Sequence, residues 1–283
     1  RLFKMSLEIL KKYNIKAKKS LGQNFLVNDE IVEEIANTFD IKQKNIVEVW
    51  PGYWALTQKL LIKNPKSLEL IELDKDMIEI LEKRVKNWDF SLDWVDFKIN
   101  NIDVLDWNPK VLSPSQAWDG LKGGYFVIAN IPYYITSPIL RHFLYDIENK
   151  PEKMLILMQK DVGDKILSSK SSVLSLFIAK KCYVKEEIFV WKENFVPAPK
   201  IESSVLSFEL HNLYNEINDD KFLKLIKIWF SSPRKKLVKN FANAWYDKKY
   251  IIDILDKMSL DSGIRAEDLN IADWCEFIWN FNI

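Results

Sequence analysis

The chain has 283 residues, nearly half of them apolar, which is enough for one large domain or for a large and a small one. The formal net charge is only +1, so any binding to nucleic acid must depend on local basic patches. Two cysteines without CxxC spacing and two histidines argue against a disulfide framework, a metal site and a Ser-His-Asp triad.

Strands and helices alternate through most of the chain. Residues 1–20 are basic and partly helical in pattern, and Asn28 is a good N-cap for a helix at 29–39. We then expect strands at 46–50, 67–73, 95–100, 125–129 and 154–158, and helices at 55–62, 75–86, 138–145 and from residue 161. No signal peptide or apolar run of membrane length is apparent, so we expect a cytoplasmic protein.

The order of these elements predicts the fold class. The runs 183–191 and 203–210 indicate an antiparallel pair that follows the parallel strands. Alternation of strand and helix predicts an α/β fold with a doubly wound sheet. After Leu210 the pattern is wholly helical, from Asp219 onward. We therefore expect two domains, at 1–212 and 213–283.

Polar residues follow three successive strands of this sheet. The first strand leads into Trp50-Pro51-Gly52-Tyr53-Trp54, where a glycine lets the backbone approach a ligand closely. Glu72 ends the second strand and can accept hydrogen bonds from ribose hydroxyls. Asp103, after the third strand, can accept from an adenine amino group while Ile102 packs on the ring. No P-loop lysine is present, so the pattern predicts a pocket for an adenosine-bearing cofactor without phosphate, and S-adenosylmethionine fits.

The strand at 125–129 leads into Asn130-Ile131-Pro132-Tyr133-Tyr134. Loops at the carboxyl ends of such strands bind ligands. Asn130 offers a side-chain carbonyl, and Pro132 restricts Ile131 to an extended conformation that can turn its own carbonyl outward. Tyr133 offers a flat ring. Two acceptors and an aromatic face suit an amino group on a planar heterocycle, although a polar loop with a packed tyrosine is an equally simple interpretation.

Five segments together resemble one known family. The Asn-Ile-Pro-Tyr motif at 130–133 is similar to the Asn-Leu/Ile-Pro-Tyr motif of rRNA adenine N6-dimethyltransferases. Gly-Gln-Asn-Phe-Leu at 22–26 and Phe-Val-Pro-Ala-Pro-Lys-Ile at 195–201 resemble two further motifs of that family, and 231–236 and 264–269 resemble its C-terminal helical domain. The last match favours the small-subunit (16S) dimethyltransferases over the antibiotic-resistance relatives that act on 23S rRNA.

This resemblance implies a fold, a cofactor and a substrate. The fold would be the seven-stranded, Rossmann-like methyltransferase sheet with a small helical domain that binds RNA. The cofactor would be S-adenosylmethionine. The partner would be 16S rRNA within the immature small ribosomal subunit, methylated at two adjacent adenines of a hairpin near its 3′ end. The family also suggests a monomer that needs no metal.

The resemblance also assigns residues to roles. The target base would be held by Asn130, Ile131, Pro132, Tyr133 and Phe195, with Tyr133 and Phe195 stacking on its two faces. The cofactor would be held by Gln23, Asn24, Leu26, Trp50, Gly52, Glu72, Leu73, Ile102, Asp103 and Asn130. RNA phosphates would be contacted by Lys16, Lys18, Lys19, Arg234, Lys235 and Lys236.

Two tryptophans depart from the family's pattern. Trp50 occupies the first glycine position of the turn after the first strand, and Trp54 stands where a small residue is usual. Trp229 and Trp245 also look more natural as small residues. Glycine is scarce at 7 residues, against about 20 expected, while tryptophan is abundant at 11. The hypothesis is that several tryptophans are glycines encoded by UGA, a stop codon that some genetic codes read as Trp and others as Gly.

Two alternatives stay open at this point. The same chemistry could act on 23S rRNA and confer macrolide resistance. An indole at position 50 should also collide with a cofactor that approaches the backbone, so a catalytically impaired RNA-binding assembly factor is a second alternative.

Overall fold

The computed structural model describes residues 3–86, 92, 94–109, 124–232 and 234–281. It divides into two compact units. The first extends to residue 163 and includes 185–209, and the second comprises 164–184 together with the chain from residue 210 onward. The predicted boundary at residue 212 differs from this division, because 164–184 groups with the C-terminal helices.

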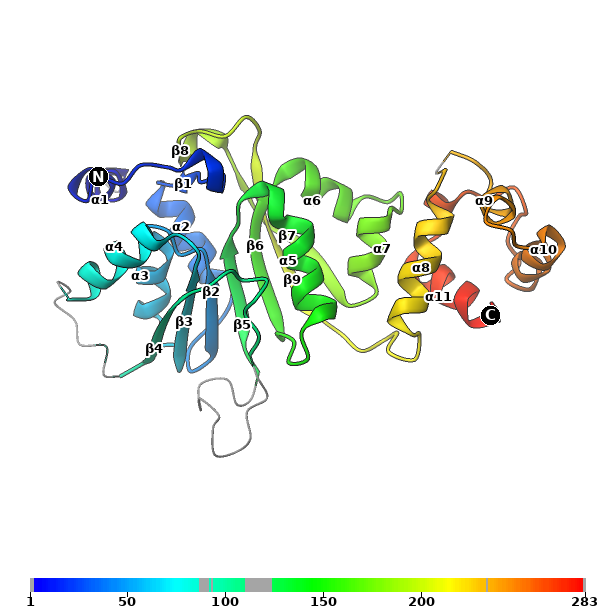
Figure 1. Cartoon of the computed structure of the whole chain (residues 1–283), viewed down its shortest axis with the longest axis horizontal. Helices are drawn as coiled ribbons and strands as arrows, with labels where there is room; N and C mark the ends of the chain where they lie inside the picture. Colours follow the sequence, from blue (N-terminus) through cyan, green and yellow to red (C-terminus); the bar gives the residue numbers. More distant parts are fainter. Residues whose placement is uncertain (1–2, 87–91, 93, 110–123, 233, 282–283) are drawn as a thin grey trace. The chain divides into compact units, whose positions relative to one another are not determined.

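A seven-stranded sheet forms the centre of the first unit (Figure 1). Its strand order is β4-β3-β2-β5-β6-β9-β7. The first five strands in this order pair in parallel, and β9 pairs antiparallel with β6. The strands are β2 (Asn45–Val49), β3 (Ser67–Glu72), β4 (Asp96–Asn101), β5 (Phe126–Asn130), β6 (Lys153–Gln159), β7 (Cys182–Val190) and β9 (Ser203–Leu210). This confirms the predicted α/β class with its seven-stranded sheet.

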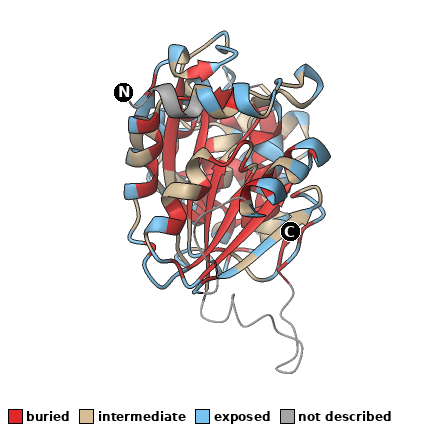
Figure 2. Cartoon of the chain, turned by 90° about the vertical axis from the view of Figure 1, so that its left-hand side faces the viewer, coloured by how far each residue is buried: buried red, intermediate tan, exposed pale blue. Residues whose placement is uncertain are grey.

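Burial explains why the central strands read as apolar runs. Every residue of β2 and β3 is buried, as expected for parallel strands covered on both faces. Figure 2 shows the buried strands in red with helices around them. The edge strand β4 alternates between exposed and half-buried residues instead.

The helices of the first unit alternate with the strands of the sheet. They include α1 (Phe3–Lys12), α2 (Asp29–Asn37), α3 (Ala55–Ile62), α4 (Lys75–Lys86), α5 (Thr136–Arg141) and the start of α6 (Lys160–Leu167). The Asn28 side chain caps α2 by accepting from the backbone N–H groups of Glu30 and Ile31. The predicted ranges 55–62 and 75–86 are confirmed as α3 and α4.

The predicted helix at 138–145 is wrong in its bounds and its kind. A 3₁₀ turn at Tyr133–Ile135 leads directly into α5, and a π-helical turn at His142–Asp146 ends it. Pro138 is tolerated within the first turn of α5, because proline lacks a backbone N–H and an N–H at that position would have no intrahelical acceptor. The π turn closes with Ile147 N–H donating to the His142 carbonyl at 3.2 Å.

A short two-stranded sheet joins distant parts of the chain. In it β1 (Phe25–Leu26) pairs antiparallel with β8 (Phe195–Val196), so Phe25 lies opposite Val196 and Leu26 opposite Phe195. The two motifs at 22–26 and 195–201 are therefore neighbours in space.

The second unit is a helical bundle around an aromatic core. Its helices include α7 (Val173–Ala179), α8 (Asp219–Trp229), α9 (Leu237–Asn243), α10 (Lys248–Lys257) and α11 (Ile271–Asn280). Trp229 of α8 stacks on Trp274 of α11 with 3.7 Å between ring centroids, and both are fully buried.

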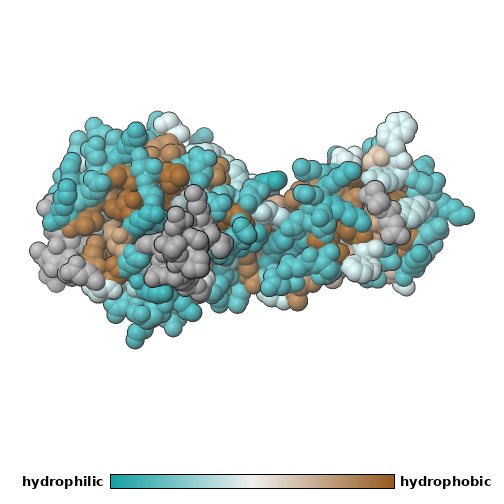
Figure 3. All heavy atoms as spheres, turned by 60° about the horizontal axis from the view of Figure 1, so that its bottom comes forward, coloured by the Kyte–Doolittle hydropathy of each residue, from teal (hydrophilic) through white to brown (hydrophobic). Residues whose placement is uncertain are grey.

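Within the described residues, no helix is both long and apolar enough to cross a membrane. On the face drawn in Figure 3, hydrophobic residues gather in patches between hydrophilic ones.

Candidate active site

A cavity opens at the carboxyl ends of β2, β3 and β5. The sheet order changes direction between β2 and β5, and open α/β sheets bind ligands at such a switch point. The cavity holds about 950 Å³ of empty space, part of it open to solvent. It is lined by most of the residues predicted to act on the base or the cofactor: Gln23, Asn24, Leu26, Trp50, Gly52, Glu72, Asn130, Ile131, Pro132, Tyr133 and Phe195.

One side of the cavity is the loop after β5. Asn130 is the last residue of β5 and is half-buried, while the Ile131 side chain is buried. The Tyr133 hydroxyl lies 2.7 Å from Ser203 Oγ of β9, which fixes the ring at the wall of the cavity. Burial raises the pKa of Tyr133, although the hydrogen bond with Ser203 opposes the shift, so the hydroxyl is neutral at physiological pH. Phe195 is buried on β8 and lines the same cavity.

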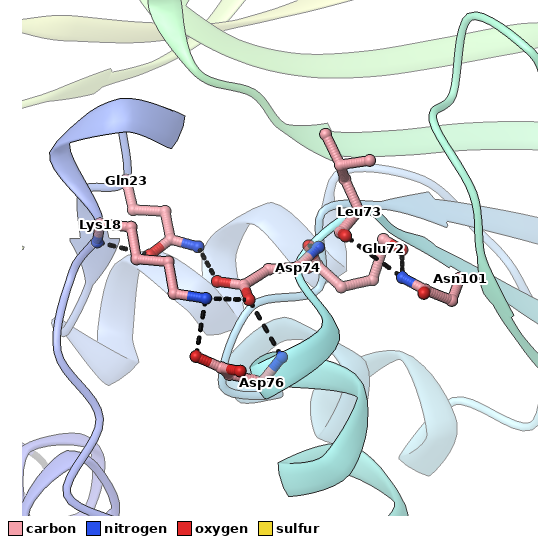
Figure 4. A network of polar contacts seen from close by, with 7 residues as sticks. All are labelled: Lys18, Gln23, Glu72, Leu73, Asp74, Asp76 and Asn101. Carbon is pink, nitrogen blue, oxygen red and sulfur yellow. Dashed lines mark hydrogen bonds and ion pairs between the residues drawn. The ribbon is translucent and has the colours of Figure 1, made fainter.

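Polar contacts hold the N-terminal segment 18–26 beside another part of the cavity. Gln23 Nε2 donates to Asp74 Oδ2 at 2.9 Å, and Lys18 Nζ lies 2.5 Å from Asp74 Oδ1 and 2.7 Å from Asp76 Oδ2 (Figure 4). The Tyr53 hydroxyl donates to the Leu26 carbonyl at 2.6 Å. Burial raises the pKa of Asp74, but the hydrogen bonds from Lys18 and Gln23 outweigh it, so that pKa is lowered overall. A charged network thus holds the segment beside the end of β3.

Glu72 sits at the end of β3 as a buried carboxylate. Its Oε1 accepts from Asp74 N–H at 2.8 Å and its Oε2 accepts from Gly52 N–H at 3.4 Å. Burial raises its pKa to about 7, against these two backbone hydrogen bonds. The weaker contact with Gly52 leaves Oε2 available to hydroxyl donors of a ligand in the cavity.

Three predicted cofactor residues, Leu73, Ile102 and Asp103, do not line the cavity in the part of the chain that the structure describes. Asp103 Oδ1 accepts from Leu105 N–H at 3.0 Å and so stabilises the turn after β4. Asn101, which the sequence did not single out, donates from Nδ2 to the carbonyls of Glu72 and Leu73 and joins the ends of β3 and β4 (Figure 4).

Comparison with known proteins decides the family. The family model described as "Ribosomal RNA adenine dimethylase" matches residues 14–281. The chain belongs to this family. A relative from Mycoplasma mobile, named "Ribosomal RNA small subunit methyltransferase A", is 36% identical over 90% of this chain and 94% of its own length. A relative of the same name from Prochlorococcus marinus (strain MIT 9312) is also 36% identical, over 94% and 96%.

Solved structures agree on the fold. A dimethyladenosine transferase from Plasmodium falciparum matches with a TM-score of 0.71 at 22% identity, covering 88% of this chain and 94% of its own. The 23S rRNA methyltransferase ErmE matches with a TM-score of 0.68 at 17% identity, over 91% and 99%. The chain is therefore an rRNA adenine dimethyltransferase that uses S-adenosylmethionine as methyl donor, and the small-subunit relatives do not favour the 23S alternative.

The residues that line the cavity suit this cofactor, with the exception of Trp50. Gly52 lets the backbone come close to a ligand, and Glu72 offers carboxylate oxygens for ribose hydroxyls. Trp50 does not fit, because a tryptophan occupies a lining position where the dimethyltransferase needs a close backbone approach.

Glu48 is a site residue that the sequence analysis missed. It lies on the buried strand β2, is 1% exposed and lines the cavity. Burial raises its pKa to about 8. Its Oε2 accepts no hydrogen bond from the described residues. The signal that could have identified Glu48 from sequence was an acidic residue within a strand predicted to be buried.

The residues predicted to bind RNA are either exposed or already paired with carboxylates. Lys16 and Lys19 are exposed, and Arg234, Lys235 and Lys236 are exposed just before α9. Lys18 is held by Asp74 and Asp76, so its charge is already balanced within the dimethyltransferase. Its contact with phosphate stays a prediction that the structure makes less favourable.

The buried acid predicts a pH dependence of stability. The pKa of Glu48 is higher in the folded chain than the ordinary value of 4.5, so the folded state binds its proton more tightly and loses stability as pH rises from about 4.5 to about 8. Glu48→Gln removes this titration. We expect the difference in melting temperature between variant and parent to grow in the variant's favour between pH 5 and pH 8.5, measured by differential scanning calorimetry. An equal difference at both pH values would contradict the shifted pKa.

Proposed function

We propose that this dimethyltransferase modifies N6 of two adjacent adenines in a hairpin near the 3′ end of 16S rRNA, within the immature small subunit. It would act as a monomer in the cytoplasm. The observation that carries the proposal is that the Asn130–Tyr133 loop and Glu72 line one cavity at the switch point of the sheet. The names of the two relatives at 36% identity support the small subunit as the target.

The loop supplies the acceptors that this chemistry needs. The lone pair of an adenine amino group is delocalised into the ring, so the nitrogen is a poor nucleophile. Acceptors on its hydrogens favour a tetrahedral nitrogen and free the lone pair for attack. The Asn130 side-chain oxygen and the Ile131 carbonyl take that role. S-adenosylmethionine supplies an electrophilic methyl group when bound.

Aromatic rings hold the target adenine, and its methylation requires no strong general base. Tyr133 stacks on one face of the extruded adenine and Phe195 covers the other. The methylated nitrogen is acidic and releases its proton readily to solvent. Asn130, Tyr133 and Phe195 thus position and polarise the amine, and they leave proton removal to water.

Asn130→Ala tests the acceptor. We expect methyl transfer to fall below detection, because the amine loses its side-chain acceptor, while the affinity for S-adenosylhomocysteine stays nearly unchanged. Tritium transfer to small-subunit particles and calorimetric titration measure the two effects. Asn215→Ala, at an exposed asparagine outside the cavity, is the matched control. Retained turnover in Asn130→Ala would remove the loop from the chemistry.

Two variants of Tyr133 distinguish the contribution of ring stacking from that of the hydroxyl hydrogen bond. Tyr133→Phe keeps the ring but loses the contact with Ser203, and we expect a small change in kcat/KM for RNA. Tyr133→Ala loses stacking worth about 1–3 kcal/mol, so kcat/KM should fall roughly 5- to 150-fold. The exposed neighbour Tyr134→Ala serves as the control. Equal losses in Tyr133→Phe and Tyr133→Ala would assign the residue a structural role only.

The basic segment before α9 predicts a salt effect. Each phosphate contact contributes a slope of about 0.7–0.9 to the fall of log K with log salt. The double variant Lys235→Ala/Lys236→Ala should lower that slope by about one to two in filter binding to 16S rRNA. Lys248→Ala/Lys249→Ala removes two exposed charges from α10 and is the control. An unchanged slope in Lys235→Ala/Lys236→Ala would place the RNA elsewhere.

Mapping of methylated adenines tests the proposed target directly. We expect modification of two adjacent adenines when immature small-subunit particles are the substrate, and none on 23S rRNA. Modification of 23S rRNA would overturn the target. The alternative of a silent assembly factor, which Trp50 favours, predicts binding to the particle without affinity for S-adenosylmethionine.

A further inference from the structure

Three tryptophans occupy backbone conformations that favour glycine. Trp50 has φ +55°, Trp54 has φ +81° and Trp245 has φ +69°. The described chain has seven non-glycine residues with positive φ, and these three are the bulky ones; the others are Asn14, Gln43, Asn64 and Ser259. Asparagine tolerates this region, but a large side chain there is a genuine outlier.

Trp245 stands in the glycine position of a helix end. It follows α9 and its cap, Ala244. Trp245 N–H donates to the Ala242 carbonyl and Tyr246 N–H donates to the Phe241 carbonyl, both at 3.1 Å, which is the Schellman pattern. The rings of Phe241 and Tyr246 also pack edge to face, the apolar contact that accompanies this pattern. The Trp245 side chain is 97% exposed, so nothing in the fold uses the indole.

Trp50 and Trp54 flank a true glycine in the turn after β2. The left-handed residues alternate at positions 50, 52 and 54, and Gly52 between them has φ +55°. Trp50 N–H donates to the Ile71 carbonyl and Trp54 N–H to the Pro51 carbonyl, both at 3.0 Å, so the backbone is fixed. Trp54 is also the N-cap of α3, a position where its side chain makes no capping hydrogen bond.

Trp107, Trp229 and Trp274 have ordinary backbone conformations, and their indoles make contacts within the fold. Trp107 is outside the positive-φ set, is buried, and donates from Nε1 to Glu69 Oε1 at 3.1 Å. Trp229 and Trp274 lie within helices and stack on each other, so the structure gives no support to glycine at position 229. Backbone conformation thus separates positions 50, 54 and 245 from the other tryptophans of the described chain.

We infer that positions 50, 54 and 245 are glycines in the functional protein, encoded by UGA codons that its own translation system reads as glycine. The turn after β2 then reads Gly-Pro-Gly-Tyr-Gly, and position 50 presents backbone rather than an indole to the cavity. The inference rests on backbone geometry and is independent of the proposed RNA target.

The native gene and its product test this without any variant. We expect TGA at codons 50, 54 and 245 and TGG at codon 107. Mass spectrometry of peptides from the protein purified from its own cells should show glycine at the three positions and tryptophan at position 107. A TGG codon, or a peptide with tryptophan, at any of the three overturns the inference for that position.

Variants of the recombinant chain give a second readout. Trp245→Gly and Trp245→Ala remove the same exposed indole, and only Trp245→Gly relieves the left-handed backbone. We expect Trp245→Gly to melt about 2–4 °C above Trp245→Ala. Equal melting temperatures, or a higher one for Trp245→Ala, would overturn the inference at this position.

Position 50 is tested by ligand binding. Trp50→Gly should bind S-adenosylhomocysteine at least about tenfold more tightly than the chain with tryptophan, in calorimetric titration. Trp94→Gly removes an indole outside the cavity and should leave the affinity unchanged. Equal affinity in Trp50→Gly and the parent would overturn the inference at position 50. The proposed function is tested separately, by the loss of activity in Asn130→Ala.

Discussion

The site depends on one constraint, the turn that connects β2 to α3 at the switch point of the sheet. That turn must reverse direction over five residues while its backbone stays close to the cavity. It does so with left-handed residues at positions 50, 52 and 54 and with backbone hydrogen bonds to Ile71 and Pro51. Gly52 N–H also reaches Glu72, so the turn and the end of β3 are fixed by the same contact.

The electrostatics of the cavity favour a cation. Glu48 and Glu72 are both buried beside it, and burial raises the pKa of each. A positively charged ligand lowers the pKa of a neighbouring carboxyl and recovers part of the cost of burying it. S-adenosylmethionine carries a sulfonium and an ammonium, and its demethylated product lacks the sulfonium charge. Two buried acids beside the cavity therefore favour the binding of a cationic cofactor.

Much of this could be predicted from sequence because the signals were local. Apolar runs located the strands, and Asn28 and the 75–86 pattern located helices to within a residue or two. The loop at 130–133 and the motif at 22–26 were found as linear patterns. The helix at 138–145 was misjudged because Pro138 reads as a start signal although it lies within the first turn. Glu48 was missed because a strand pattern does not reveal which ends share a cavity. The pairing of β1 with β8 likewise depends on contacts between segments about 170 residues apart, which no local pattern encodes.

The tryptophan content shows how sequence and structure contribute differently. The family's pattern pointed to Trp50 and Trp54 and the composition supported a replacement of glycine, but Trp229 was grouped with Trp245 on appearance. Backbone dihedrals distinguish them, because a helix residue needs no glycine whereas the C′ position of a Schellman motif does. Trp54 shows the limit of burial as a guide, since its indole is fully buried and stacks on Phe97 while its backbone still adopts a glycine conformation. A side chain can fill the space around a position without being the residue that the backbone requires, and the backbone is the more stringent test.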